Sequence, residues 1–240
     1  MSEHHHEGIP MAKLSVNRQT MSGLGKALMA AAPAMAPAVA VSALRRIVDL
    51  GIDGYSRLPG VNHAPATALQ KLRSSKPAIE ALVKQHLAMA GAQGFVTNLG
   101  GFEVMALTMP ANVTGIAIVQ ARMVACVAHL RGYDVDDPRV RGAVMMCLLG
   151  DRGVQELVDK GDLPSPMVVA TAPVLDDSLH ATIAEKVMSA LVANATGRRM
   201  AVAVTKRVPV VGGGVGAVAD GWSTYTIAQF AKRQFVNRHR

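Results

Sequence analysis

Three side chains that could carry out acyl-transfer chemistry lie on one predicted helix. Arg122, Cys126 and His129 are spaced four and three residues apart, so one face of a helix would hold them all. A thiol with a histidine one turn away can act as a nucleophile and its base. These residues are the candidate catalytic set of a hydrolase for an acyl or ester substrate. No third triad member or oxyanion donor is assignable, so a partly buried polar face is the favoured interpretation.

A glycine-rich run near the C-terminus has the spacing of a dinucleotide-binding turn. Gly212, Gly214 and Ala217 follow an apolar segment in the pattern G-x-G-x-x-A. Too few residues follow for a βαβ unit of about 30 residues, and no acidic residue beyond Asp220 could hold a ribose hydroxyl. Close helix packing, or backbone flexibility beside a membrane, explains these glycines better. No cofactor is expected.

Motifs that would define a reaction or a metal site are missing from the sequence. It contains no GxSxG, HExxH, P-loop or CxxC pattern. An acidic run that ends in Asp137 is explained by capping of the next helix rather than by metal binding. The remaining isolated polar candidates have no partner at metal or triad spacing; they are His63, His86, His180 and Glu103.

The C-terminal stretch from Gly221 to Arg240 combines aromatic and basic residues and contains no acid. On a helix, an apolar aromatic stripe would be flanked by basic residues, as in an interfacial membrane helix. The alternative, weighted almost equally, is a final core helix with a solvated basic tail. Under the first interpretation the residues that contact lipid are Trp222, Tyr225, Phe230, Lys232, Arg233, Phe235 and Arg238.

Composition limits the kind of protein and its surroundings. The chain has 240 residues, of which 50% are hydrophobic, 3% aromatic and 18% charged, and this apolar content excludes a disordered chain. The formal net charge of +8 favours an anionic partner. Nucleic acid is not expected, because no stacking platform, helix-turn-helix or zinc knuckle accompanies the charge. Cys126 and Cys147 lie in apolar surroundings and are expected to be buried, reduced thiols, which suit the cytoplasm.

Helical periodicity dominates and predicts an all-α fold, a single compact domain with glycine-rich helix breaks and a basic amphipathic C-terminal helix. We expect residues 1–26 to form a tail and residues 27–240 to form the domain. Weak strand signals occur only at Met167–Leu175 and Val208–Val211. The predicted helices are Pro37–Leu50, a helix from Pro77 to about Ala90, Pro110–Arg131, Pro138–Leu149 with Asp137 as its N-cap, and a helix from Asp176 or Asp177 to about Leu191.

Two uncharged segments raise the question of a membrane span. Ala27–Leu44 contains Pro33 and Pro37, and Val104–Ala121 contains several polar residues. Both fall short of the roughly 20 predominantly apolar residues that a span needs. Buried helices or shallow insertion are the favoured alternatives, and the start of the chain has no secretory signal pattern.

Ordered motifs in the last two thirds of the chain resemble the EcsC-like bacterial proteins. Leu130–Asp151 is similar to their helix, aromatic–Asp turn and Asp-Pro helix start, although Arg131 and Gly132 precede Tyr133 without the first aromatic of that turn. Gly91–Pro110 resembles the family's glycine-rich approach, and Arg207–Ala231 resembles its late Pro-Val-Val-Gly element. The family is named for a protein encoded beside a bacterial ABC transporter. The resemblance implies a helical, often membrane-associated protein and supplies no catalytic residues.

The sequence therefore predicts a protein without a demonstrable enzyme motif, peripheral to the inner face of the cytoplasmic membrane. It would bind an anionic membrane surface or lipid, or assist a membrane transporter or secretion system. The alternative is the hydrolase that uses Cys126 and His129.

Overall fold

Helices are the only regular secondary structure in the part of the chain that the structure describes, as the composition predicts. The computed structural model describes residues 37–54, 59–98, 101–173, 178–191 and 212–238. The helices are α2 (Pro37–Asp53), α3 (Ala64–Leu72), α4 (Ser75–Asn98), α5 (Gly101–Leu130), α6 (Pro138–Cys147), α7 (Gly150–Asp159), α8 (Pro166–Thr171), a helix over residues 178–191, and α10 (Gly212–Gln234).

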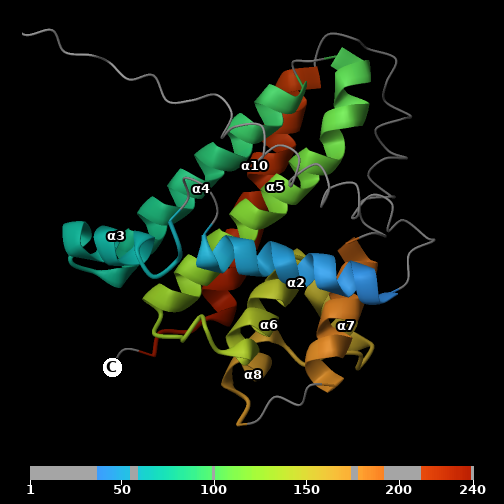
Figure 1. Cartoon of the computed structure of the whole chain (residues 1–240). Helices are drawn as coiled ribbons and strands as arrows, with labels where there is room; N and C mark the ends of the chain where they lie inside the picture. Colours follow the sequence, from blue (N-terminus) through green and yellow to red (C-terminus); the bar gives the residue numbers. More distant parts are fainter. Residues whose placement is uncertain (1–36, 55–58, 99–100, 174–177, 192–211, 239–240) are drawn as a thin grey trace, which may run out of the picture.

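Three long helices, α4, α5 and α10, lie side by side and form one layer of the molecule (Figure 1). An ion pair between Lys232 and Glu80 joins the end of α10 to the beginning of α4, so these two helices are antiparallel. A hydrogen bond from Gln120 Nε2 to Thr224 Oγ1, 3.1 Å long, joins the middles of α5 and α10. Just beyond their ends, the backbone nitrogen of Arg238 donates a 2.9 Å hydrogen bond to the carbonyl oxygen of Arg131, so α5 runs in the same direction as α10. The end of α4 therefore lies near the beginnings of α5 and α10.

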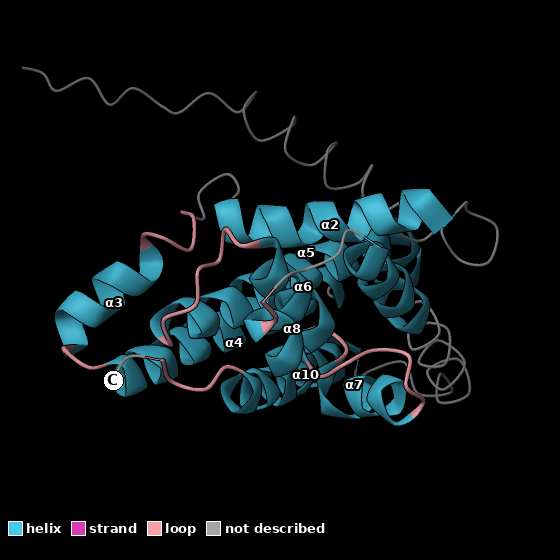
Figure 2. Cartoon of the chain, turned by 90° about the horizontal axis from the view of Figure 1, so that it is seen from below, coloured by secondary structure: helices cyan, strands magenta, loops and turns pink. Residues whose placement is uncertain are grey.

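Helix α2 lies on the other side of α5 from α10, with α5 and α6 between them (Figure 2). It crosses α5 at Gly51, where a Cβ atom would lie 3.0 Å from the Cβ of Ala121, the backbone nitrogen of Arg122 and the carbonyl oxygen of Ile118. That distance is too short for a side chain, so the absence of one at Gly51 allows the helices to approach closely.

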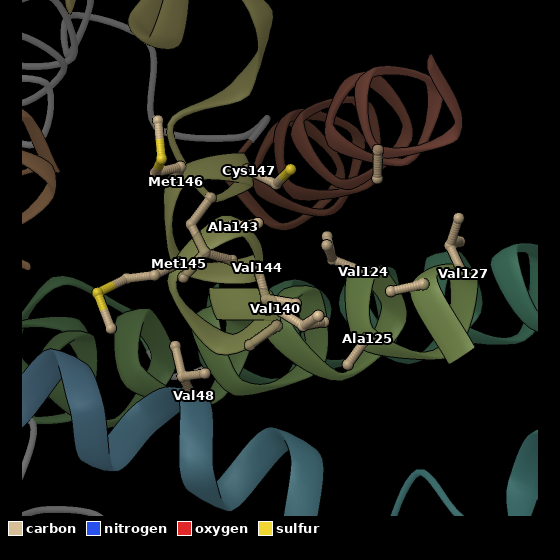
Figure 3. Packing of buried hydrophobic residues seen from close by; sticks show 14 of the residues in the cluster. Val48, Val124, Ala125, Val127, Val140, Ala143, Val144, Met145, Met146 and Cys147 are labelled. Atoms are coloured by element: carbon tan, nitrogen blue, oxygen red, sulfur yellow. The ribbon is translucent and has the colours of Figure 1, made fainter. Parts of the chain in front are cut away.

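The core is built mainly from small and flexible apolar side chains. Val48 of α2, Val124 of α5 and Val144 of α6 belong to it (Figure 3), and each is at most 1% exposed. One cluster of buried residues includes members of α2, α4, α5, α6, α7 and α10. Burial of this apolar surface is the main force that holds the helices together.

The start of α6 agrees with the sequence prediction. The side chain of Asp137 accepts a hydrogen bond of 2.8 Å from the backbone nitrogen of Arg139, and Pro138 is the first helical residue. The N-cap prediction is confirmed, whereas the end of the helix was predicted two residues too late. Gly150, with a φ of +71°, begins α7.

Helix α5 begins earlier than its sequence predicts. The expected start was Pro110, but α5 begins at Gly101 and Pro110 lies inside it. A proline within a helix costs about 3 kcal/mol relative to alanine. Packing of α5 against α4 and α10 offsets that cost, and such tertiary contacts are invisible in local sequence. The end of the helix was predicted well, since Gly132, with a φ of +86°, follows it closely.

The weak strand signal at Met167–Leu175 corresponds to no strand in residues 167–173, the part of it that the structure describes, in agreement with the predicted all-α fold. Helix α8 occupies its first part, because Ser165 accepts a hydrogen bond from the backbone nitrogen of Val168 and Pro166 stands at the first helical position. The other strand candidate, Val208–Val211, and the predicted tail lie outside the described residues. Among the described helices, none is long and apolar enough to cross a membrane.

Candidate functional site

The three candidate catalytic residues differ in how deeply they are buried. All belong to α5, but Cys126 is fully buried and Arg122 is 3% exposed, whereas His129 is half-buried in the last turn. Arg122 Nη1 donates a hydrogen bond to the carbonyl oxygen of Pro59, which fixes the segment before α3 against α5. This contact gives Arg122 a structural role in holding the helices together.

Electrostatics argue against Cys126 as a nucleophile. Burial raises the pKa of its thiol to about 12, although the nearby Arg122 acts weakly in the opposite direction. Burial raises the pKa of Cys147 as well. A thiol is reactive as its thiolate, and at neutral pH neither cysteine is ionised in this environment. The prediction of buried, reduced thiols is confirmed, because both cysteines are free and buried.

His86 is a buried histidine of α4. It is 1% exposed, and its Nδ1 atom lies 2.7 Å from the carbonyl oxygen of Leu82, so that nitrogen donates and Nε2 carries no proton in the neutral ring. Burial, opposed in part by that hydrogen bond, lowers the pKa of His86 to about 4. A histidine that stays neutral to this acidity contributes to packing, and its position in the core between helices fits that role.

Two of the predicted lipid-contact residues, Phe230 of α10 and Phe235 just after its end, face inward. Phe230 is 3% exposed and Phe235 is fully buried. The ring of Phe235 packs edge-on against Tyr133, with the ring centroids 5.1 Å apart. The apolar stripe with Phe230 and Phe235 therefore faces the protein core in this structure, whereas its sequence suggested a contact with lipid. The periodicity of α10 is that of a core helix, which was the alternative interpretation.

The basic residues of α10 are paired with carboxylates from other helices. Lys232 Nζ lies 2.6 Å from Glu80 Oε1, and Arg233 Nη2 lies 2.5 Å from Asp151 Oδ2. Arg238, beyond the helix, stacks over the ring of Tyr133 at 5.1 Å. Two of the predicted basic contacts are thus neutralised in place, so the attraction of this segment to an anionic surface is smaller than its sequence predicts.

The outward side of α10 carries the exposed apolar residues. Val218 is 72% exposed, Trp222 66% and Tyr225 41%. They are spaced four and three residues apart, so they lie along one side of the helix, opposite the core stripe. The rings of Trp222 and Tyr225 are 5.7 Å apart and tilted by 33°. We call Val218, Trp222 and Tyr225 the α10 aromatic face.

A second feature is a cavity of about 520 Å³ beside the turn between α5 and α6. We call it the turn cavity. Its lining comes from that turn, the start of α6, the end of α8 and the C-terminal segment, and comprises Gly132, Asp134, Asp137, Arg139, Val140, Ala170, Thr171 and Arg238. Sequence reasoning missed it, because α8 and Arg238 are remote in sequence from the turn.

The acidic run at this turn has structural partners. Asp137 caps α6, and Asp136 shares the guanidinium of Arg141 with Asp49 and Asp53 of α2. This network joins α2 to α6. Among the described residues, no group of three or more His, Cys, Asp or Glu side chains is arranged to hold a metal ion.

These observations define an all-helical protein with an exposed aromatic helix face and a polar cavity beside an aromatic–Asp turn. The model of the EcsC protein family matches residues 10–239, so the chain belongs to the EcsC protein family. This confirms the resemblance found in the sequence. No curated protein and no solved structure was found to match the chain.

Proposed function

We propose that this EcsC-family protein binds peripherally to an anionic membrane surface through the α10 aromatic face. The observation that carries the proposal is the exposure of Trp222, 66% open to solvent beside Tyr225 on one side of a rigid helix. Large apolar side chains gathered on a protein surface mark interaction sites. Tryptophan and tyrosine are also the residues enriched where protein meets lipid headgroups.

The surroundings of this face favour a membrane as its partner. By sequence, Ala88–Ala121 contains Glu103 as its only charged residue, and Val208–Ala219 contains none. These segments include the end of α4 and the beginnings of α5 and α10, which lie at the same end of the helical layer. A low density of charge near the aromatic face lowers the cost of bringing it to the headgroup region.

The energetics are those of reversible binding. Burying an exposed aromatic side chain is worth roughly 1.5–3 kcal/mol, and two partly exposed rings give a few kcal/mol in total. The net charge of +8 adds a long-range attraction to an anionic leaflet. A location at the cytoplasmic face belongs to the same proposal, because that leaflet is the anionic one. Assistance to a transporter or secretion system would follow from such recruitment.

Co-sedimentation with vesicles tests this proposal. The purified chain is mixed with vesicles of phosphatidylglycerol and phosphatidylcholine, and the bound fraction is measured against lipid concentration. The variant Trp222→Ala/Tyr225→Ala is expected to bind at least tenfold more weakly, a change of about 1.4 kcal/mol. Substitution is preferable to truncation before Gly221, which would also remove the buried Phe230 and Phe235.

A matched control removes exposed apolar surface elsewhere. Leu69 and Leu72 of α3 are 40% and 42% exposed, and Leu69→Ala/Leu72→Ala is expected to bind like the parent chain. Equal loss in both double variants, or no binding by the parent chain, would contradict the proposal. If the parent chain self-associates without binding lipid, and the Trp222→Ala/Tyr225→Ala variant loses that self-association, the α10 aromatic face would be assigned to a second copy of the protein instead.

The hydrolase is not proposed as a second function. Its nucleophile would be Cys126, and the burial of that thiol together with its raised pKa leaves no thiolate at neutral pH.

A further inference from the structure

The turn cavity has the size of a small-molecule site. Its volume of about 520 Å³ lies within the roughly 300–1,000 Å³ of pockets that bind metabolites. Its walls combine buried apolar residues, Val140 and Ala170, at 2% and 4% exposure, with charged side chains. Segments remote in sequence build it together, because Arg238 follows α10 and Asp134 precedes α6.

Two of the four charged residues that line the cavity satisfy each other. Arg139 Nε lies 2.9 Å and 3.0 Å from the two carboxylate oxygens of Asp137. Arg139 also donates to the carbonyl oxygen of Ala172. The pair is neutral as a unit and held in place by the start of α6 and the end of α8, so it forms a fixed wall.

The other two charged residues keep hydrogen-bonding capacity. Arg238 is held by its backbone, which donates a 2.9 Å hydrogen bond to the carbonyl oxygen of Arg131. Its guanidinium stacks on Tyr133, and no carboxylate of the described residues lies within ion-pairing distance of it. Asp134 uses Oδ1 to accept a hydrogen bond from the backbone nitrogen of Asp136. The cavity therefore offers one cation and one carboxylate that are not paired with each other.

We propose that the turn cavity binds a small zwitterion, a molecule with an oxyanion group for Arg238 and an ammonium group for Asp134. Amino acids and aminoalkyl phosphates share this chemistry. A guanidinium on a carboxylate or phosphate, and a carboxylate on an ammonium, are charge-assisted contacts stronger than neutral hydrogen bonds.

This site is distinct from the α10 aromatic face. Trp222 and the end of α10 at Gln234 are separated by roughly 18 Å of helix, and Arg238 lies beyond that end. Loss of vesicle binding in the Trp222→Ala/Tyr225→Ala variant would leave the cavity intact, so the two proposals can fail independently.

Calorimetric titration of the full chain tests the cavity. Phosphoethanolamine represents the aminoalkyl phosphates, and glycine represents the amino acids. Inorganic phosphate carries only the oxyanion group, and ethanolamine carries only the ammonium group. At least one zwitterion is expected to bind saturably and about tenfold or more tightly than either half. Arg238→Gln and Asp134→Asn are each expected to weaken that binding by about tenfold or more, and Arg238→Lys by less.

Matched controls remove the same charges elsewhere. Arg152, whose side chain is 95% exposed, and Asp159, both on α7 and outside the cavity lining, supply Arg152→Gln and Asp159→Asn, which are expected to bind like the parent chain. Three results would overturn the proposal. The first is that neither zwitterion binds saturably. The second is that inorganic phosphate binds as tightly as the zwitterions and Asp134→Asn has no effect, and the third is that the control variants lose as much affinity as Arg238→Gln and Asp134→Asn.

Discussion

Cys126 and Cys147 illustrate how burial decides the chemistry of a residue. Both thiols are fully buried, and burial raises the pKa of Cys126 to about 12. We expect neither to react with a thiol reagent at pH 8 in the folded protein, and both to react once the chain is unfolded in guanidinium. Absorbance during labelling with dithiobis-nitrobenzoate measures this. Rapid modification of one thiol per folded chain would restore the hydrolase hypothesis.

His86 makes stability depend on pH. Its pKa is about 4 in the folded protein against 6.5 for an unperturbed histidine, so the unfolded chain binds a proton first as the pH falls. The free energy of unfolding therefore decreases from about pH 6.5 downward, and the full loss of about 3 kcal/mol is reached near pH 4. Above pH 6.5 both states are neutral and the residue makes no pH-dependent contribution.

Urea unfolding at pH 7 and pH 4.5 measures this effect. The difference between the two pH values is expected to be smaller in His86→Asn, which keeps a donor near the position of Nδ1. His63→Asn, which changes an exposed histidine before α3, is the control and is expected to behave like the parent chain. An identical pH dependence in all three proteins would show that His86 titrates normally.

At the scale of helices, the crossing of α2 over α5 depends on Gly51. A Cβ atom there would lie 3.0 Å from backbone atoms of α5, so Gly51→Ala requires the two helices to separate. We expect a loss of about 1–3 kcal/mol in the free energy of unfolding, as for an overpacked core.

Gly91 of α4 is the matched control, because no atom lies within 4 Å of a Cβ built there. Gly91→Ala is expected to be neutral or stabilising by roughly 0.5–1 kcal/mol. Equal effects in thermal unfolding would contradict this account of the crossing.

The ion pairs of α10 predict a gain of lipid binding. Arg233 lies three helical turns beyond Trp222 on the same side of α10, and Asp151 of α7 neutralises it. Asp151→Asn frees that charge, which near an anionic leaflet is worth about 1 kcal/mol, or about fivefold in affinity. Asp159→Asn removes the same charge from the other end of α7 without freeing an arginine. Vesicle binding should increase only in Asp151→Asn, and an equal increase in both variants would point to net charge alone.

Local signals predicted the elements well, and tertiary contacts account for what they missed. Asp137 and Pro138 define the start of α6 by capping interactions that act within a few residues, so the local sequence is enough to predict that start. The start of α5 at Gly101 depends on packing against other helices. The helix at Pro166–Thr171 depends on a short cap that outweighs the β-branched residues nearby. Periodicity can identify the stripe with Phe230 and Phe235, but it cannot tell whether core or lipid covers that stripe.

Prediction of the candidate site was less complete for the same reason. Trp222 and Tyr225 were identified from their clustering, and both are exposed. The neutralising carboxylates of Glu80 and Asp151 lie far from α10 in sequence, so their pairing with Lys232 and Arg233 could not be predicted. The turn cavity likewise exists only where remote segments meet.

At the scale of the whole molecule, the protein is a helical body without a spanning helix among its described residues, and one of its helices presents aromatic rings. Lys232 and Arg233 of α10 are held in ion pairs with Glu80 and Asp151, so apolar contact rather than charge is expected to dominate affinity. Binding should therefore persist, though weakened, when salt screens the net charge of +8.

Fluorescence of Trp222 tests the central claim most directly, because it is the only tryptophan of the chain and reports on its own surroundings. On addition of vesicles containing phosphatidylglycerol, its emission is expected to shift to shorter wavelength and to be quenched by brominated lipid chains. Emission that stays at the wavelength of a solvent-exposed ring, while the protein sediments with the same vesicles, would show that another surface binds the membrane.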